Sequence, residues 1–230
     1  MKDSFILVAI LAIVIDQTIA ADISGKVGFE GNAPKRARIQ MNADPQCARI
    51  HKSPVTGEEV LVNANATLKN VLVYVKEGLK GKKFEGPNSK VVFDQKGCVY
   101  TPHVLGVQTG QEVEVLNSDP LIHNVHSLSK ENPSFNVAQP KKGMKLSKKF
   151  EKPELFKVKC EVHPWMGAYI GVFNHPFFSV TGDDGTFSLK KLPAGEYTLE
   201  AWHEKYGTQT MKVTVGATDT KTVDFKFVSK

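Results

Sequence analysis

Residues 160–166 read Cys-Glu-Val-His-Pro-Trp-Met and bring a thiol, an imidazole and a thioether into one short segment. Apolar and β-branched residues on both sides predict that this segment is a loop between two strands. A thiolate, imidazoles and a distant thioether are the donors typical of copper that alternates between Cu(I) and Cu(II). The segment therefore predicts Cys160, His163 and Met166 as ligands of one ion, with another imidazole supplied by a neighbouring strand.

Residues 122–126, which read Ile-His-Asn-Val-His, can supply that imidazole. Side chains alternate along a strand, so His123 and His126 point to opposite faces and only one of them can reach the ion. His123, at the entrance of the strand, is the predicted ligand, and Asn124 is expected to brace the ligand loop. Structural zinc favours four strong ligands without a thioether. A second cysteine on the loop, which a binuclear copper centre needs, is lacking, so the prediction is one copper ion.

The rest of the chain has the sequence pattern of an all-β protein, in which short runs of Val, Thr and Phe alternate with the turn-forming residues Pro, Gly, Asn and Asp. Seven short strands between residues 91 and 173 predict a sandwich with Greek-key connections. The predicted division is an N-terminal β segment at 21–89, a Greek-key domain at 90–175 and a smaller β domain at 176–230. In the first of these, Asp44 and Pro45 predict the start of a short helix that carries Cys47.

Residues 1–20 are expected to be a cleaved export signal, because an early lysine precedes an apolar run that ends in small residues. The run is too short to span a bilayer, so no membrane insertion is expected after cleavage. Export to the periplasm or another outside compartment favours disulfides. With Cys160 assigned to the metal, Cys47 and Cys98 are the predicted disulfide, and the alternative is three reduced, buried thiols.

The formal net charge is +6, and many lysines fall between residues 141 and 159. Two interpretations remain for this stretch: a solvated strand face, or a surface that docks an acidic protein. Export argues against binding to nucleic acid.

The two ligand segments resemble those of the cupredoxins, the blue copper electron carriers, and the short ligand loop is similar to that of the amicyanins. The resemblance covers residues 91–174. It implies His123, Cys160, His163 and Met166 as type 1 copper ligands and Asn124 as a partner of the Cys160 sulfur. Residues 187–202 resemble a carboxypeptidase regulatory-like (transthyretin-like) β-sandwich, and residues 23–27 are similar to its first strand. Whether the two ends pair into one sandwich with the cupredoxin inserted stays open.

The resemblance implies an exported one-electron carrier, not an enzyme, whose partners are redox proteins such as a c-type cytochrome, an oxidase or a dehydrogenase. The alternatives are a periplasmic copper-binding or delivery protein and a copper-containing scaffold subunit. Electrons are expected to pass through His163, lying near the surface with Pro164 and Trp165. His103 is either a surface residue or one that perturbs the copper site.

Overall fold

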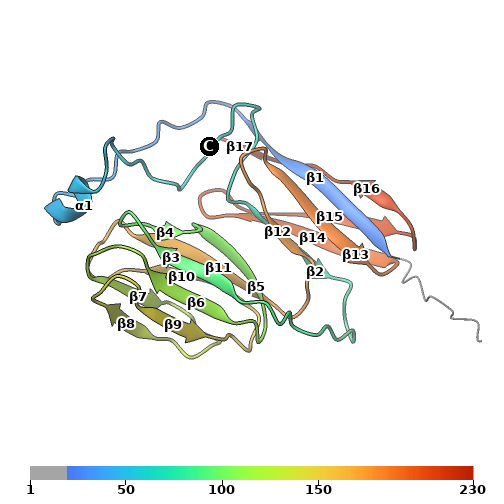
Figure 1. Cartoon of the computed structure of the whole chain (residues 1–230). Coiled ribbons are helices and arrows are strands. Elements are labelled where there is room, and N and C mark those ends of the chain that lie inside the picture. The colour runs from blue at the N-terminus through green and yellow to red at the C-terminus, as the bar shows by residue number, and fades with distance from the viewer. Residues whose placement is uncertain (1–19, 230) are drawn as a thin grey trace, which may run out of the picture.

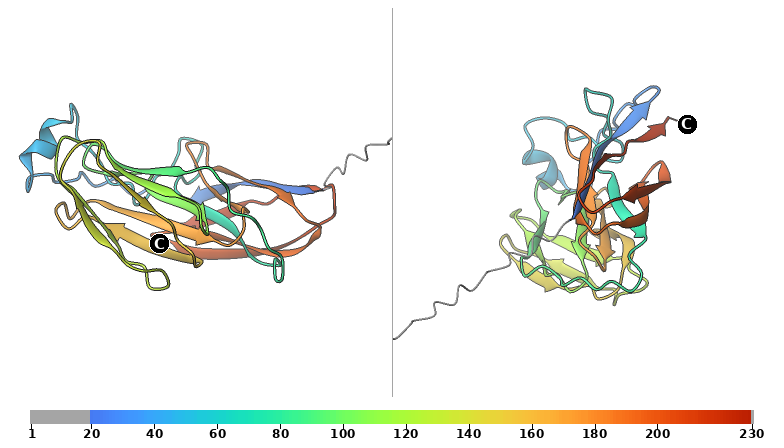
Figure 2. Two further views of the ribbon diagram at one scale, coloured as in Figure 1. Left: turned by 60° about the horizontal axis from the view of Figure 1, so that its bottom comes forward. Right: turned by 90° about the vertical axis from the view of Figure 1, so that its right-hand side faces the viewer.

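The computed structural model describes residues 20–229, so the predicted export signal at 1–20 lies almost wholly outside the described residues. The described part of the chain is all-β apart from one short helix, and it forms two sandwiches that lie next to each other in an elongated molecule (Figures 1 and 2). Among the described residues, no helix has the length and apolar character needed to cross a bilayer.

The terminal sandwich combines strands from both ends of the chain. In one sheet β1 pairs with three strands from the C-terminal part of the chain. In the other sheet β2 lies between two further strands from that part. The first sheet contains β1 (Ala21–Glu30), β13 (Thr186–Leu192), β16 (Thr220–Thr222) and β17 (Phe225–Val228). The second contains β12 (Phe178–Val180), β2 (Leu72–Glu77), β14 (Gly195–His203) and β15 (Gly207–Val215).

The inner sandwich lies in sequence between β2 and β12. Its connections are of the Greek-key type, because β9 returns to pair with β6 after two strands in the opposite sheet. One sheet has the order β5 (Val104–Gln108), β11 (Gly167–Phe173), β10 (Glu154–Lys159), β7 (His123–Ser127) and β8 (Asn136–Gln139). The other has the order β4 (Tyr100–Thr101), β3 (Val91–Gln95), β6 (Val113–Asn117) and β9 (Lys145–Lys148).

Each sandwich has its own apolar core, which follows from the alternation of residues along its strands. In β6, Val113, Val115 and Asn117 are buried while the residues between them are partly exposed. Residues 60–62, an apolar run that favours a strand, contribute only an isolated bridge from Val62 to Leu68. The four-residue strand β8 lies at the edge of its sheet.

Glycines bring the two sandwiches into close contact. Gly106 on β5 and Gly171 on β11 are register partners in adjacent parallel strands. A Cβ atom on Gly171 would lie 2.5 Å from Cδ2 of Leu72, and one on Gly106 would lie 2.6 Å from Cδ2 of Phe178. Both contacted side chains belong to the terminal sandwich, so the missing side chains let one sheet pack directly on the other.

A long excursion from the terminal sandwich reaches across to the end of the inner one (Figure 1). Its base is closed by backbone hydrogen bonds from Ile39 to Val55 (2.9 Å) and from Gly57 to Ala37 (2.9 Å). We call residues 38–56 the capping loop. It contains the helix α1 (Pro45–Arg49), which begins after Asp44 as predicted.

Two buried histidines should make the protein less stable in mild acid. Burial lowers the pKa of His175 to about 4 and that of His203 to about 4, and both Nδ1 atoms accept backbone N–H groups. Both rings are neutral when folded, but in the unfolded chain they gain protons below their usual pKa of about 6.5. The two histidines should therefore lower stability as pH falls from 6.5 to 4, by on the order of 3 kcal/mol each, and their contribution should level off below pH 4.

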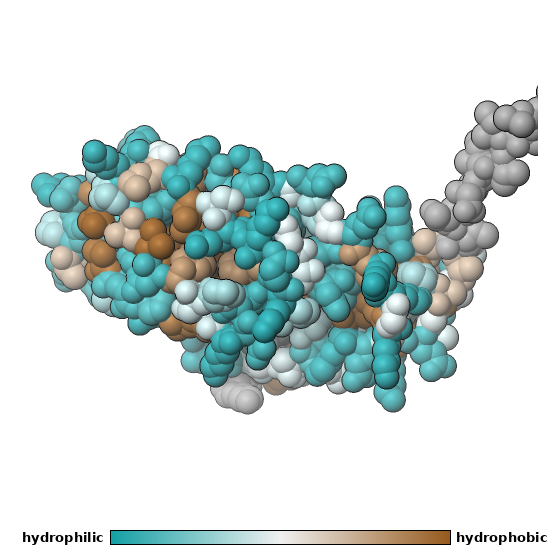
Figure 3. Space-filling view, turned by 90° about the horizontal axis from the view of Figure 1, so that it is seen from below, coloured by the Kyte–Doolittle hydropathy of each residue, from teal (hydrophilic) through white to brown (hydrophobic). Residues whose placement is uncertain are grey.

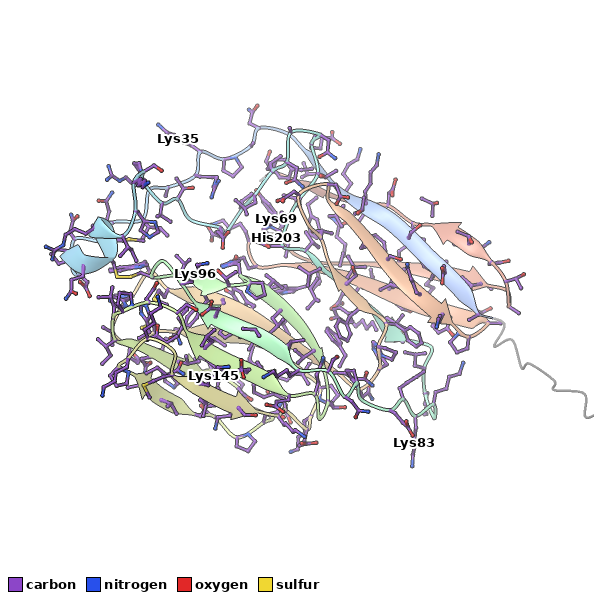
Figure 4. The ribbon with its side chains drawn as sticks, viewed as in Figure 1. Lys35, Lys69, Lys83, Lys96, Lys145 and His203 are labelled. Carbon is purple, nitrogen blue, oxygen red and sulfur yellow. A yellow bond between two sulfur atoms is a disulfide. The ribbon has the colours of Figure 1, made fainter. Side chains whose placement is uncertain are left out.

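The variant His203→Asn keeps an acceptor at this position, which Figure 4 shows in the terminal sandwich, and removes the titrating ring. Urea unfolding should show a smaller loss of stability between pH 6.5 and 4 for this variant than for the natural protein. Equal losses would contradict the assignment.

Candidate metal centre

The structure brings His123, Cys160 and His163 together at one end of the inner sandwich. One ligand atom from each residue lies within 4.8 Å of the others. The Nδ1 atoms of the two histidines are 3.1 Å apart, and Sγ of Cys160 is 3.9 Å from Nδ1 of His163. All three side chains are buried. Three donors that meet at this distance in the interior are suited to a metal ion.

The loop that carries Cys160 and His163 is closed by its own backbone. The N–H of Met166 donates to the carbonyl of His163 (2.9 Å), and the N–H of Cys160 donates to the carbonyl of Met166 (3.2 Å). The N–H of His163 also points at Sγ of Cys160, at 3.3 Å. These contacts turn the thiol and the imidazole of one short segment toward the same point.

Asn124 braces this loop from the neighbouring strand β7. Its Oδ1 accepts the N–H of Glu161 at 3.1 Å, and its Nδ2 donates to Asn136 at 2.6 Å. His126, two residues further along β7, points away from the centre and pairs with Glu161. Alternation along the strand therefore separates the two histidines as the sequence indicates.

Each histidine of the centre is held by a carboxylate through Nε2. His123 Nε2 is 2.9 Å from Oδ2 of Asp119, and His163 Nε2 is 3.1 Å from Oδ2 of Asp44. An ionised carboxylate only accepts hydrogen bonds, so both Nε2 atoms carry the proton. In neutral rings this leaves two lone pairs on Nδ1 atoms that face each other inside the protein. A cation between them satisfies both, which is the observation that best fits a metal site.

The charges of these groups agree with that arrangement. Burial alone would raise the pKa of Cys160, but contacts with His123 and with backbone N–H groups outweigh it and lower the pKa below the usual value for a thiol. Burial likewise opposes ionisation of Asp119, whereas hydrogen bonds from His123, Cys98 and Gly97 lower its pKa. The hydrogen bond from His163 is the main cause that lowers the pKa of Asp44. The Cys160 thiolate therefore forms more readily than that of an ordinary cysteine, and a thiolate is the form of cysteine that binds metals.

Met166 closes the ligand loop, and its side chain is 1% exposed in the core of the inner sandwich. His103 lies elsewhere: its Nε2 pairs with Glu204 of the terminal sandwich, and Nδ1 is 4.0 Å from Glu58. His103 thus helps to join the two sandwiches and is not among the residues that meet at the centre.

The expectation that His163 lies near the surface is wrong. Its exposed fraction is 0%, because the capping loop covers its outer edge and places Asp44 against the ring. No sequence pattern predicts this contact, since Asp44 is 119 residues away and has a local role at the start of α1. The one available signal was the predicted disulfide, which places α1 close to residue 98.

That disulfide is present between Cys47 and Cys98 and lies beside the centre; Figure 4 shows its yellow bond next to α1. Sγ of Cys47 is 3.5 Å from Nε2 of His163. On the other side, the N–H groups of Gly97 and Cys98 both donate to Asp119 at 2.8 Å. The disulfide therefore joins the segment that carries Asp44 to the turn whose N–H groups hold Asp119.

Comparison with known proteins gives partial similarities to different segments. Residues 163–228 match the carboxypeptidase regulatory-like domain. No curated protein sequence shows significant similarity to this chain.

Among solved structures, the purple cupredoxin from Nitrosopumilus maritimus is 22% identical, with a TM-score of 0.31, and the match covers 37% of this chain and 99% of that one. A reduced amicyanin variant is 23% identical, with a TM-score of 0.33 and coverage of 44% and 97%. The copper-containing nitrite reductase from Thermus scotoductus SA-01 is 26% identical, with a TM-score of 0.33, and the match covers 40% of this chain but only 24% of the enzyme.

Proposed function

We propose that this protein is an exported mononuclear type 1 copper protein that carries single electrons between redox partners. The observation that carries the proposal is the meeting of the Cys160 thiol with the Nδ1 atoms of His123 and His163 in a buried site. His123, Cys160 and His163 would hold the ion, with Met166 as a weak fourth ligand. When bound there, copper supplies a change between Cu(I) and Cu(II), that is, one electron.

The protein contributes a site that has little freedom to move. Carboxylates orient both imidazoles, Asn124 braces the ligand loop, and the N–H of His163 points at Sγ of Cys160. Such partners fix the orientation of ligands and tune the metal. A donor set held in one arrangement favours rapid electron transfer, because little has to reorganise when the charge changes. This supports a carrier, not an enzyme, as the role of the chain.

Because His163 is buried, we propose that electrons enter and leave at another part of the surface. Ile122 and Val162, each next to a ligand in the sequence, are 44% and 40% exposed. Figure 3 shows apolar side chains gathered on the visible face of the inner sandwich. We propose that a redox protein, such as a c-type cytochrome, an oxidase or a dehydrogenase, docks near these two residues. The burial of the site beneath a disulfide-anchored loop argues against a delivery protein, which has to release its copper readily.

Copper binding is tested by loading the mature protein with Cu(II) and recording visible and EPR spectra. Strong thiolate-to-copper absorption is expected in the natural protein and complete loss of it in Cys160→Ser. His123→Gln should also lose the spectrum, whereas His126→Gln is a matched control on the same strand and should keep it. A colourless protein that binds zinc in preference to copper would refute the proposal.

A further inference from the structure

The capping loop is anchored to the inner sandwich by contacts of several kinds. The Cys47–Cys98 disulfide joins α1 to the loop before β4, and Nε2 of His51 donates to the carbonyl of Gly97 at 2.8 Å. Met41 is buried in the core of the inner sandwich, and Ile39 and Val55 pack against the same core. These contacts hold the capping loop over the metal centre.

Asp44 is the residue of this loop that reaches a predicted ligand. Its Oδ1 accepts the N–H of Gln46 at 2.9 Å and caps α1, while its Oδ2 accepts Nε2–H of His163 at 3.1 Å. The first hydrogen bond fixes the orientation of the carboxylate, so the second oxygen faces the ring. The local structure of the capping loop thereby determines which nitrogen of His163 is free.

We propose that Asp44 is a positioning residue that holds His163 with Nδ1 turned to the metal and makes the site prefer Cu(II). This inference rests on the proposed function. A carboxylate that accepts the Nε2 proton makes the imidazole a stronger electron donor at Nδ1. A stronger donor stabilises the higher charge of Cu(II) more than that of Cu(I). His123 receives the same support from Asp119, but there the carboxylate belongs to the inner sandwich itself.

The structure offers a substitution that separates the two contacts of Asp44. Serine is an effective N-cap residue, so Asp44→Ser should keep α1, but its side chain is too short to reach His163. Asp44→Asn has a single oxygen, so with that oxygen on the N–H of Gln46 its Nδ2 donor faces Nε2 of His163, and this variant should lose the Nε2–H preference as Asp44→Ser does. Glu58→Gln is the charge control, because Glu58 lies just beyond the capping loop and faces His103 instead of the ligands.

Asp44→Ser should bind Cu(II) about tenfold more weakly and Cu(I) with unchanged affinity, since removing such a partner typically costs 10- to 100-fold. A tenfold change corresponds to a reduction potential higher by about 59 mV for one electron. In the metal-free protein, nitrogen NMR should show His163 protonated at Nε2 in the natural protein and in Glu58→Gln. Asp44→Ser should lose that preference.

The two readouts separate failure of this inference from failure of the proposed function. If the protein bound no copper, the NMR comparison would still decide whether Asp44 selects the tautomer of His163. If copper bound as proposed but Asp44→Ser had the natural potential and the natural tautomer, Asp44 would have no positioning role.

Discussion

Replacing Cys47 and Cys98 together by serine should lower the free energy of unfolding by about 4 kcal/mol. The two residues are 51 positions apart, and a cross-link over a loop of that length removes much of the conformational freedom of the unfolded chain. Both sulfurs are buried in the core of the inner sandwich, so the double variant should unfold at a lower urea concentration than the natural protein. Urea unfolding followed by circular dichroism measures it.

The double variant should also weaken the cover of His163, because the capping loop would then be held only by noncovalent contacts. Treating the natural protein with a dithiol reductant should give the same loss of stability, and the reductant should have no further effect on the double variant. Unchanged unfolding after verified reduction would show that the disulfide does not restrain the capping loop.

Substituting Gly171 by valine should destabilise the protein by about 3 kcal/mol. Its new Cβ would lie 2.5 Å from Leu72, whose side chain is fully buried between the sandwiches and has little room to move. The expected result is separation of the two sheets, so that one cooperative unfolding transition becomes two. Calorimetry of the natural protein and the variant would show it.

Gly182→Val is the matched control, because a Cβ at Gly182 has no atom within 4 Å. This variant should unfold like the natural protein. If Gly171→Val also unfolded in one transition, at the unfolding temperature of the natural protein, β11 could not pack directly on Leu72.

The sequence was informative where a property depends on neighbouring residues. The short ligand loop, the choice of His123 over His126 and the start of α1 at Asp44 all follow from spacing, strand alternation or helix capping. The all-β class likewise follows from local patterns. The seven predicted strands do not include β8, because Asn136–Gln139 is only four residues long and has a polar residue at each end. Its place depends on pairing with β7 and on a buried hydrogen bond between Gln95 and Gln139.

Features that depend on distant contacts could not be read in advance. Gly106 and Gly171 look like ordinary strand glycines until Leu72 and Phe178 are placed opposite them. The contact of Asp44 with His163 is of the same kind, since the preference of Asp44 for a helix start already explains its presence. When a residue such as Asp44 has a local role that explains its presence, the sequence does not indicate its second contact with a distant residue.

The terminal sandwich acts as a common platform for the capping loop and the inner sandwich. The loop leaves after β1 and returns before β2, while the inner sandwich leaves after β2 and returns at β12, which pairs with β2. The capping loop and the candidate metal centre are therefore parts of one molecule, and they meet at an effective concentration on the order of millimolar whatever the dilution of the protein. A partner protein that binds at the covered edge of His163 must therefore displace the capping loop and not only water.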